Sequence, residues 1–456
     1  MPVAQKICRL FGSISGLQLN LPKTIVVPLG DASPLAVQNW LRLHGDAWQE
    51  VACESWSTYL GMATGPGKGA HSWTKALKSL SERCALWPWS SLGLQFSARA
   101  YNVFVFSVLS FVAQLEEPPP EAFESERRAL ARAAPGPHRW CALADLWNLD
   151  SGFGLGFSFR SLTCYAKASQ MRVAIWESSA AGGLNLPDKI ARVNRAWAST
   201  EFLGRRSRWA SWYHASHVLV LHRALQALSD LHLSPSSVIS VLSGGALRPW
   251  TRTIHESTKS STQRWLYARL MEPPSMWAEE RVRYKLQRLM LPGIPRIVAS
   301  RVLRRLRSLS RLVPPRVHAA VLSTIWNRWC TLRRFQVVSQ TRHSCLLGCI
   351  SGEDSIEHSL RCPVLLEVAR RRLNLYLSGS DSWAAFFLAS EGSGIDSEST
   401  LARLALLVYA VYRTTNAARN CGKLSQETAR RAIHEAIYEG ARGHARASHF
   451  VVHCFS

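Results

Sequence analysis

Acidic residues are scarce in this 456-residue chain. Its 31 Asp and Glu stand against 55 Lys and Arg, which leaves a formal net charge of +24 at pH 7. So strong a positive charge indicates which partners the protein binds and says little about its fold. It favours nucleic acid ahead of an anionic membrane. A merely soluble basic protein would spread its charge evenly, whereas this chain concentrates it. We therefore expect contacts with the backbone of DNA, RNA or both.

The chain also lacks the features of a secreted or membrane-spanning protein. Its first sixteen residues contain no apolar core of the kind found in signal peptides. The most apolar run, residues 101–115, is too short to span a bilayer. The eleven cysteines are odd in number and have no compact disulfide spacing. We expect an intracellular protein, nuclear or cytoplasmic, with reduced thiols and no membrane partner.

Two glycine-rich segments fail the tests for nucleotide-binding loops. GPGKG at 65–69 lacks the Walker spacing and a Ser or Thr after its lysine. GFGLGF at 152–157 lacks a preceding strand. We interpret the second segment as packing glycines.

Apolar residues recur at helical spacing through most of the chain, as in Trp73, Leu77 and Leu80. Thr24–Val27 is the clearest strand candidate. The sequence thus predicts a mainly α fold with a small β region near the N-terminus, and it is long enough for two or three cores. The five predicted parts are 1–69, 70–133, 134–294, 295–365 and 366–456.

Four potential ligands of one metal ion lie close together, in the pattern Cys345-x3-Cys349-x8-His358-x3-Cys362. Thiolates and imidazole suit tetrahedral zinc. The first pair can form a knuckle, and His358 and Cys362 would share one face of a helix. Four protein donors leave no position for water, so the predicted zinc ion is structural. The alternative is a chance gathering of cysteines.

Arginine dominates the approach to this cluster, with eleven Arg and no Asp or Glu between Arg296 and His343. One apolar stripe runs along the first helix, and a second helix interleaves Trp326 and Trp329 with cations. Guanidinium groups suit phosphate because they donate paired hydrogen bonds and stay charged. A solvated helix face is the alternative, but such faces normally mix signs. The stripe is Val298, Val302, Leu306, Leu309 and Val313. The candidate nucleic-acid ligands are Arg301, Arg304, Arg305, Arg307, Arg311, Arg328, Arg333, Arg334 and Lys23.

Three segments occur in an order that resembles a known family. They are GLQLNLPKT (16–24), STYLGM (57–62) and the basic region from NRWCTLRRF to the Cys-Cys-His-Cys cluster. Together they are similar to the C-terminal part of a non-LTR (LINE-type) retrotransposon reverse transcriptase. The resemblance implies the end of a palm with Asn20 and Lys23, a primer-grip-like turn at Tyr59, Leu60 and Gly61, then a helical thumb, a helical connector and a small zinc finger.

The family's polymerase activity needs two adjacent aspartates and one upstream aspartate that hold two Mg²⁺ ions. This chain contains no Asp-Asp pair. We therefore expect a truncated, nucleic-acid-binding protein without catalysis of its own. One alternative is part of an active RNA-directed DNA polymerase whose N-terminal half, with its Mg²⁺ site, is missing. Another is a zinc-finger interaction protein that binds protein.

Overall fold

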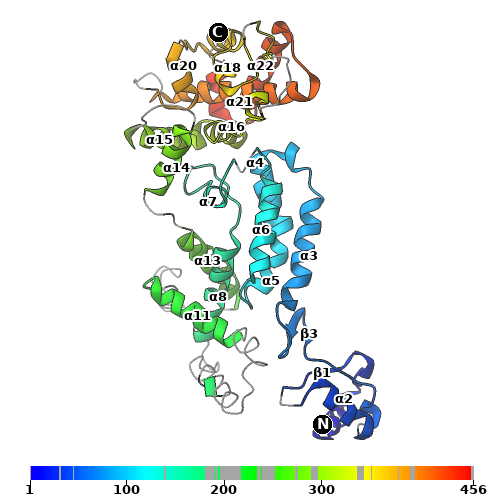
Figure 1. The fold of residues 1–456 in the computed structure, drawn as a ribbon. Helices are drawn as coiled ribbons and strands as arrows, with labels where there is room; N and C mark the ends of the chain where they lie inside the picture. Colours follow the sequence, from blue (N-terminus) through cyan, green and yellow to red (C-terminus); the bar gives the residue numbers. More distant parts are fainter. Residues whose placement is uncertain are drawn as a thin grey trace. The chain divides into compact units, whose positions relative to one another are not determined.

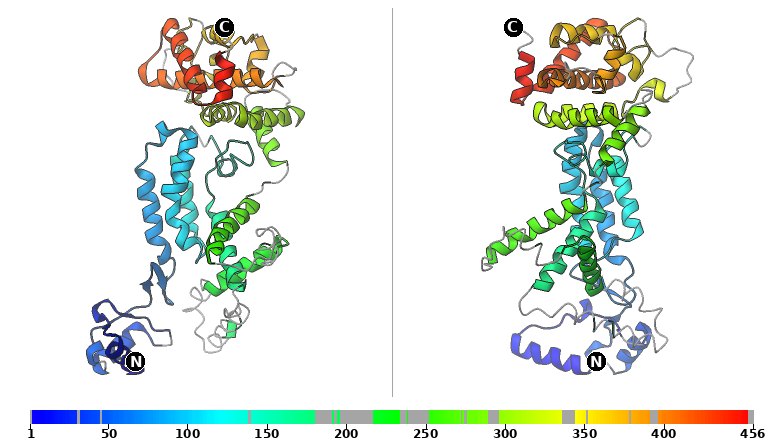
Figure 2. Two further views of the ribbon diagram at one scale, coloured as in Figure 1. Left: turned by 180° about the vertical axis from the view of Figure 1, so that it is seen from behind. Right: turned by 90° about the vertical axis from the view of Figure 1, so that its left-hand side faces the viewer.

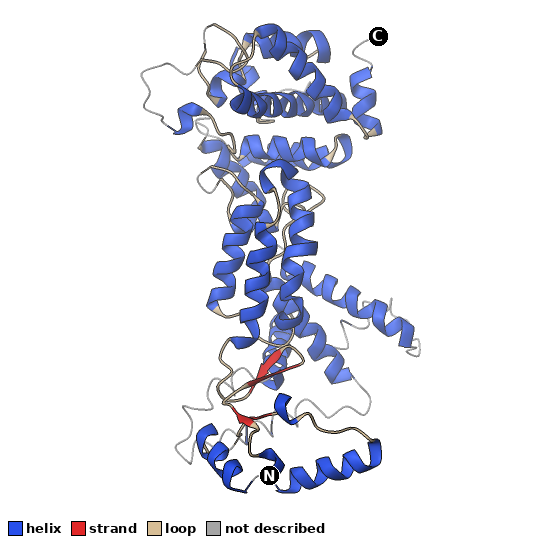
Figure 3. Cartoon of the chain, turned by 90° about the vertical axis from the view of Figure 1, so that its right-hand side faces the viewer, coloured by secondary structure: helices blue, strands red, loops and turns tan. Residues whose placement is uncertain are grey.

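The computed structural model describes most of the chain as two compact units (Figure 1). Helices dominate, and strands are confined to two short sheets (Figure 3), which confirms the prediction of a mainly α fold with a small β region near the N-terminus. The first unit comprises Met1–Arg83, Phe106–Glu126 and Ser161–Leu270, and the second comprises Cys84–Val105, Arg127–Arg160 and Met271–Ser456. The described residues are 2–29, 32–44, 46–137, 140–179, 217–233, 252–271, 276–288, 296–335, 344–350, 352–377, 379–390 and 396–452, with a few isolated positions between them.

The two sheets of the first unit contain two strands each. Strand β1 (Ile25–Val26) lies inside the predicted Thr24–Val27 segment and pairs in parallel with β2 (Ala52–Cys53). Strands β3 (Ser57–Tyr59) and β4 (Met62–Thr64) form an antiparallel hairpin with Tyr59 opposite Met62. The unit therefore has little β structure: it has two short strand pairs, and a tight turn joins the strands of the second pair.

A three-helix core supplies most of the buried apolar side chains among the described residues of Ser161–Leu270, the last segment of the first unit. Helices α11 (His217–Asp230) and α13 (Arg252–Leu270) both pack against α8 (Leu162–Ser179) (Figure 2). The core residues are Ala168, Met171, Ala174, Ile175, Leu221, Ala224, Leu228, Val238 and Leu266. The unit's other helical elements are α1 (Pro2–Ser15), η1 (Leu21–Lys23), α2 (Pro34–His44), η2 (Asp46–Trp48), most of α3 (His71–Ala85), η4 (Phe106–Leu109), α5 (Ser110–Ala113) and the first half of α6 (Pro120–Ala133).

The apolar run at 101–115 belongs to a longer helical stretch. It continues α4 (Trp89–Ala100) through the π-helical η3 (Tyr101–Val105) into η4 and α5. Among the described residues, Trp89–Ala113 is the one helix long and apolar enough to cross a membrane, and half of its apolar window is buried inside the protein. This is weak evidence for a membrane span, because a buried core helix passes the same test.

A buried carboxyl group in the first unit will make its stability depend on pH. Glu126 is 2% exposed and accepts a hydrogen bond of 2.7 Å from the backbone N–H of Leu162. Burial raises the pKa of Glu126 from 4.5 to about 7, against the opposing effect of that hydrogen bond. The buried carboxyl group therefore destabilises the fold only when it is ionised. The destabilisation is absent below the pKa that Glu126 has in the unfolded chain, and it grows as the pH rises towards 7. Above pH 7 it reaches roughly 3 kcal/mol.

Replacing this carboxyl group by an amide should remove that dependence. We expect Glu126→Gln to gain stability relative to the wild type between pH 5 and pH 8, by roughly 2–3 kcal/mol in urea unfolding. Glu121→Gln, at an exposed position of the same helix, is the control and should show no such gain. An identical pH profile for wild type and Glu126→Gln would contradict the assignment.

The second unit is organised around one long buried helix, α21 (Glu398–Cys421). It begins where the Ser397 side chain accepts the N–H of Thr400, and it ends at Gly422, whose φ of 94° favours glycine. Residues Leu404–Val411 are buried without interruption, so the helix is apolar on all sides, as in a core. It packs against both α16 (Pro315–Ile325) and α22 (Gln426–Ala441).

The amphipathic prediction for the arginine-rich helix is confirmed. Helix α15 (Arg296–Leu312) buries Val302, Leu306 and Leu309 completely, and it packs against α14 (Trp277–Gln287) and α16. Pro314 then caps α16. The remaining helices are α7 (Leu143–Trp147), α17 (Leu332–Phe335), α18 (Ile356–Ser359), α19 (Pro363–Leu373), α20 (Gly379–Phe386) and α23 (Ala445–Val452).

A buried aspartate joins α7 to α14 and to Trp326, the residue that follows α16. Asp145, on α7, is fully buried. Its carboxylate accepts two hydrogen bonds from Arg281 of α14, at 2.7 and 2.6 Å, and one from the indole of Trp326 at 3.0 Å. It also accepts the backbone N–H of Ala142 at 3.1 Å. The charge is thus both paired and hydrogen-bonded, which a buried carboxylate requires.

Candidate metal centre

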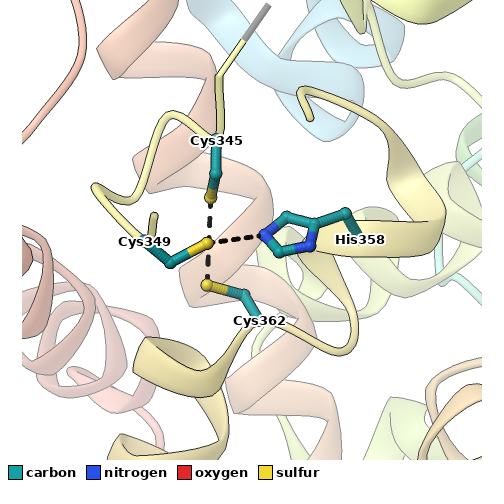
Figure 4. Close-up of side chains that lie close together, drawn as sticks. All are labelled: Cys345, Cys349, His358 and Cys362. Carbon is teal, nitrogen blue, oxygen red and sulfur yellow. Dashed lines mark hydrogen bonds between the residues drawn. The ribbon is translucent and has the colours of Figure 1, made fainter. Parts of the chain in front are cut away.

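The four predicted ligands converge on one point in the second unit (Figure 4). The donor atoms of Cys345, Cys349, His358 and Cys362 all lie within 4.8 Å of one another. The Sγ atoms of Cys345 and Cys362 are 3.9 Å apart, and the Sγ of Cys349 is 3.0 Å from Nε2 of His358. All three cysteines are at most 3% exposed.

This geometry fits a tetrahedral zinc ion. Zn–S bonds of about 2.3 Å place two sulfur ligands of a tetrahedron roughly 3.8 Å apart, close to the Cys345–Cys362 separation of 3.9 Å. The Cys349–His358 contact of 3.0 Å is shorter, so this pair would open by several tenths of an ångström around an ion. A cluster of three thiols and one imidazole could hold one metal ion, and its donors suit structural zinc.

The first ligand pair forms a tight turn that only glycine allows. The N–H of Leu347 donates to the Sγ of Cys345 at 3.4 Å, and the N–H of Gly348 donates to the carbonyl of Cys345 at 3.2 Å. Gly348 has a φ of 81°, and a Cβ there would lie 2.5 Å from the carbonyl oxygen of Leu424. The turn therefore packs directly against the chain that leads into α22.

A second glycine makes room for the histidine ligand. A Cβ on Gly352 would lie 2.0–2.3 Å from three atoms of the His358 ring, so no larger residue fits beneath the imidazole. The carbonyl of Gly352 also accepts the N–H of Cys345 at 2.8 Å. Neither glycine was singled out from the sequence, because a contact across a loop leaves no spacing signal.

The expected shared helix for His358 and Cys362 is wrong. His358 lies on the short α18, whose first turn is capped by the Ser355 side chain, and this helix ends at Ser359. Cys362 instead caps α19 with φ −59° and ψ 128°, because the following Pro363 disfavours a helical conformation in the residue before it. The two ligands still meet, through a turn between two helices.

An aspartate inside the metal loop joins it to two other elements. Asp354 is 2% exposed. Its carboxylate accepts the N–H of Leu332 at 2.9 Å and a guanidinium N–H of Arg419 at 3.2 Å. The loop is thereby fixed to the first turn of α17 and to α21. The sequence shows an acidic residue at position 354 but does not indicate that it joins these elements.

The other acids of the loop neutralise a predicted phosphate ligand. Arg333 is 3.0 Å from Glu353 and 3.8 Å from Glu357, and all three side chains are about half exposed. These acids therefore moderate the local positive charge. Arg333 therefore has to exchange carboxylate for phosphate before it can bind nucleic acid.

The thiols differ in acidity because they share one hydrogen bond. The hydrogen bond from Cys362 and the nearby imidazole of His358 lower the pKa of Cys345 to about 4, against the opposing effect of burial. The same hydrogen bond and burial raise the pKa of Cys362. Cys345 is thus the first of this pair to supply the thiolate that a metal requires.

Arg305 is buried, which corrects its prediction as a phosphate ligand. It is 3% exposed and donates to the carbonyls of Leu388 and Ser390 at 2.8 and 2.9 Å. It also donates to Asp396 at 2.9 Å, and this bond lowers the pKa of Asp396. An i, i+4 pattern of leucine and valine does not show which flanking arginine faces inward, because that depends on what packs beside the helix.

The second basic helix was also predicted wrongly. Helix α16 ends at Ile325, and Trp326 and Trp329 are 2% and 0% exposed, so these indoles belong to the core. Arg328 stacks over the ring of Trp140 at 4.8 Å and donates to a backbone carbonyl. Arg334 donates to the backbone carbonyl and side chain of Asn327. Both arginines hold the chain together in a region where the sequence predicted a binding platform.

A groove on α15 keeps the remaining arginines together. A cavity of about 410 Å³ is lined by Arg304, Arg307 and Arg311, with Ser300, Ser308, Leu303 and one acid, Glu279. Arg307 uses one N–H to reach the carbonyl of Gly152 at 3.0 Å. Gly154, with a φ of 78°, packs 3.1 Å from the backbone of Arg307, which agrees with the interpretation of that segment as packing glycines. Arg301, half-buried on the same helix, does not line the groove.

The N-terminal motif residues form two turns in the first unit. Asn20 caps η1 and accepts the N–H of Lys23 at 3.2 Å, which leaves the Lys23 side chain exposed. Leu60 and Gly61 are the two loop residues of the β3–β4 hairpin, with φ of 49° and 85°. Positive φ at both positions is typical of a type I′ turn. Tyr59 and Leu60 are 69% and 77% exposed.

No protein-family model matches the chain, and no curated protein matches it either. The chemistry of its sites therefore carries the functional interpretation.

Proposed function

We propose that this protein binds the backbone of DNA or RNA with little sequence preference, through the arginine groove on α15. The observation that carries the proposal is the composition of that groove. Arg304, Arg307 and Arg311 line it together, and among the described residues of its lining Glu279 is the one acid. Arg304 is 70% exposed, and its contact with Asp396 is long, at 4.0 Å. Three guanidinium groups along one helix face can follow successive phosphates.

The helix beneath the groove is rigidly held, which supports its use as a binding surface. Its apolar stripe is buried, and Arg305 fastens its other side to the carbonyls of Leu388 and Ser390. The exposed arginines therefore project from a backbone that is already ordered, so binding costs the conformational entropy of their side chains but little of the backbone's. The candidate zinc site would hold the backbone of the same unit in place at a second position.

We further propose that the chain is related to the C-terminal part of a non-LTR retrotransposon reverse transcriptase. Support comes from the order of a capped turn at Asn20, a hairpin at Tyr59–Met62, several helices and a Cys-Cys-His-Cys cluster. On this proposal the first unit contains the end of a palm and part of a helical thumb. The chain itself would act by binding nucleic acid.

Salt dependence tests the binding proposal directly. Three phosphate contacts give a slope of about −2.7 in log affinity against log salt, so affinity for duplex DNA should fall roughly fortyfold between 50 and 200 mM salt. Fluorescence anisotropy with labelled DNA and RNA of several sequences measures both this slope and the sequence preference. A flat salt response would sink the proposal.

A charge-matched pair of variants locates the contact. Arg304→Gln with Arg311→Gln should weaken binding at low salt by at least tenfold and reduce the slope by about two units. Lys75→Gln with Lys78→Gln removes the same charge from exposed positions on α3 and should change the slope little. Equal losses in both double variants would mean that only net charge matters. A protein-binding function would leave nucleic-acid affinity low in the wild type as well.

A further inference from the structure

A second basic cavity lies between α19 and α22, on helices that the α15 groove does not use. It measures about 290 Å³ and is lined by Arg371, Arg372, Arg430 and Arg431, together with Glu367 and Glu427. Helices α19 and α22 pack against each other, so both walls belong to one unit. His434 and Val368 complete the lining.

Among the described residues that line this cavity, the arginines outnumber the acids by two. Glu367 is shared by two guanidinium groups, at 3.1 Å from Arg371 and 2.8 Å from Arg430. Glu427 is 3.6 Å from Arg431, and both of these side chains are more than two-thirds exposed. Four arginines therefore face two carboxylates, and the cavity keeps a formal charge of +2 with His434 neutral. Burial and the charge of Arg372 lower the pKa of His434, which favours its neutral form.

The size and charge of the cavity distinguish its ligand from a polymer backbone. Backbone phosphates carry one charge each and follow one another in a row, which suits an open groove along a helix. Four guanidinium groups gathered around one cavity suit one compact dianion, because each planar group can donate two parallel hydrogen bonds to phosphate oxygens. A phosphate monoester is such a dianion near neutral pH.

We propose that the α19–α22 cavity binds a phosphate monoester, such as the phosphate of a mononucleotide or the 5′-phosphate end of a nucleic acid. Arg371 and Arg430 form the inner contacts once they release part of their bond to Glu367, and Arg372 and Arg431 close over the outer oxygens. The site would recognise the phosphate rather than the base. It stands independently of backbone binding on α15.

Calorimetric titration of the full chain with AMP, with inorganic phosphate and with adenosine tests this site. We expect one AMP per chain, weaker binding of phosphate and no binding of adenosine. Arg372→Gln with Arg431→Gln should weaken AMP binding at least tenfold, and because Arg431 and Glu427 are exposed, the fold should be retained. Arg446→Gln, which alters an exposed arginine on α23, is the control and should bind AMP normally.

Two further arms identify the source of the phosphate and separate this site from the α15 groove. A 5′-phosphorylated oligonucleotide that binds more tightly than its 5′-hydroxyl form indicates a nucleic-acid end, whereas AMP binding without such a gain indicates a free nucleotide. Arg304→Gln with Arg311→Gln should leave AMP binding unchanged. Equal binding of AMP and adenosine, or AMP binding unaffected by Arg372→Gln with Arg431→Gln, would overturn the proposal while leaving backbone binding on α15 untouched.

Discussion

Native protein will carry one zinc ion per chain, and replacing Cys345 and Cys349 by serine will remove it. Both residues are buried, and their donor atoms lie within 4.8 Å of those of His358 and Cys362. A serine hydroxyl is a poor zinc ligand at neutral pH, and two remaining donors cannot hold the ion. Native mass spectrometry of the two proteins measures the loss directly.

Loss of the ion should also destabilise the second unit. Binding to the folded state alone stabilises a protein by about 4 kcal/mol when free zinc exceeds the dissociation constant a thousandfold. Because Asp354 links the metal loop to α17 and α21, the loss should extend beyond the loop. Urea unfolding with and without a chelator, followed by tryptophan fluorescence, should reveal it. Acid should act in the same direction, because protonation of the thiolates releases the metal.

A matched control separates metal binding from the mere loss of a thiol. Cys421→Ser alters an exposed cysteine at the end of α21, outside the cluster, and should retain the zinc and the stability of the wild type. Purified protein that contains no zinc under reducing conditions, or a double variant that keeps it, would defeat the assignment.

Asp145→Ala should destabilise the second unit by about 3–5 kcal/mol, the usual cost of removing one partner from a buried ion pair. The change leaves the Arg281 guanidinium without its two hydrogen bonds of 2.7 and 2.6 Å and the indole of Trp326 without its acceptor. It also opens a space where a fully buried side chain stood. The loss should appear as a lower urea midpoint with an unchanged slope.

Asp145→Asn is the matched variant, because it keeps the shape and one acceptor oxygen but removes the charge. Its free energy of unfolding should lie between that of the wild type and that of Asp145→Ala, because the remaining amide oxygen can still accept a hydrogen bond from Trp326 or Arg281. Glu82→Ala, at an exposed position with a long contact to Lys78, should change stability by less than about 0.5 kcal/mol. An Asp145→Ala protein as stable as the wild type would show that this carboxylate does not hold α7, α14 and Trp326 together.

Local periodicity accounts for what was predicted correctly about the helices. The four-and-three spacing along residues 298–313 specifies a helix with one apolar face, and α15 buries that face. Prolines and capping residues likewise act within a few positions, as Pro314 does at the start of α16 and Ser425 at the start of α22. The departure of η3 and η4 from a regular α-helical repeat, by contrast, leaves no such local signal.

The arginines illustrate what local pattern cannot decide. Arg304, Arg305 and Arg307 lie within one turn of each other, yet Arg305 is buried against backbone carbonyls far along the chain, whereas its two neighbours line a groove. Arg328 and Arg334 likewise bond to backbone carbonyls. Charge density along the sequence overstated the number of cations available to a ligand.

The sequence by itself determined the mainly helical fold, the basic character of residues 296–343 and the four candidate metal ligands, because each depends on residue type and short-range spacing. Only the tertiary structure decided how those ligands meet, since Cys362 begins a new helix at Pro363 and Gly352 admits the His358 ring. It also decided which arginines remain exposed and that Asp354 joins the metal loop to α21. These outcomes depend on side chains that approach one another from distant segments, where no local pattern records the contact.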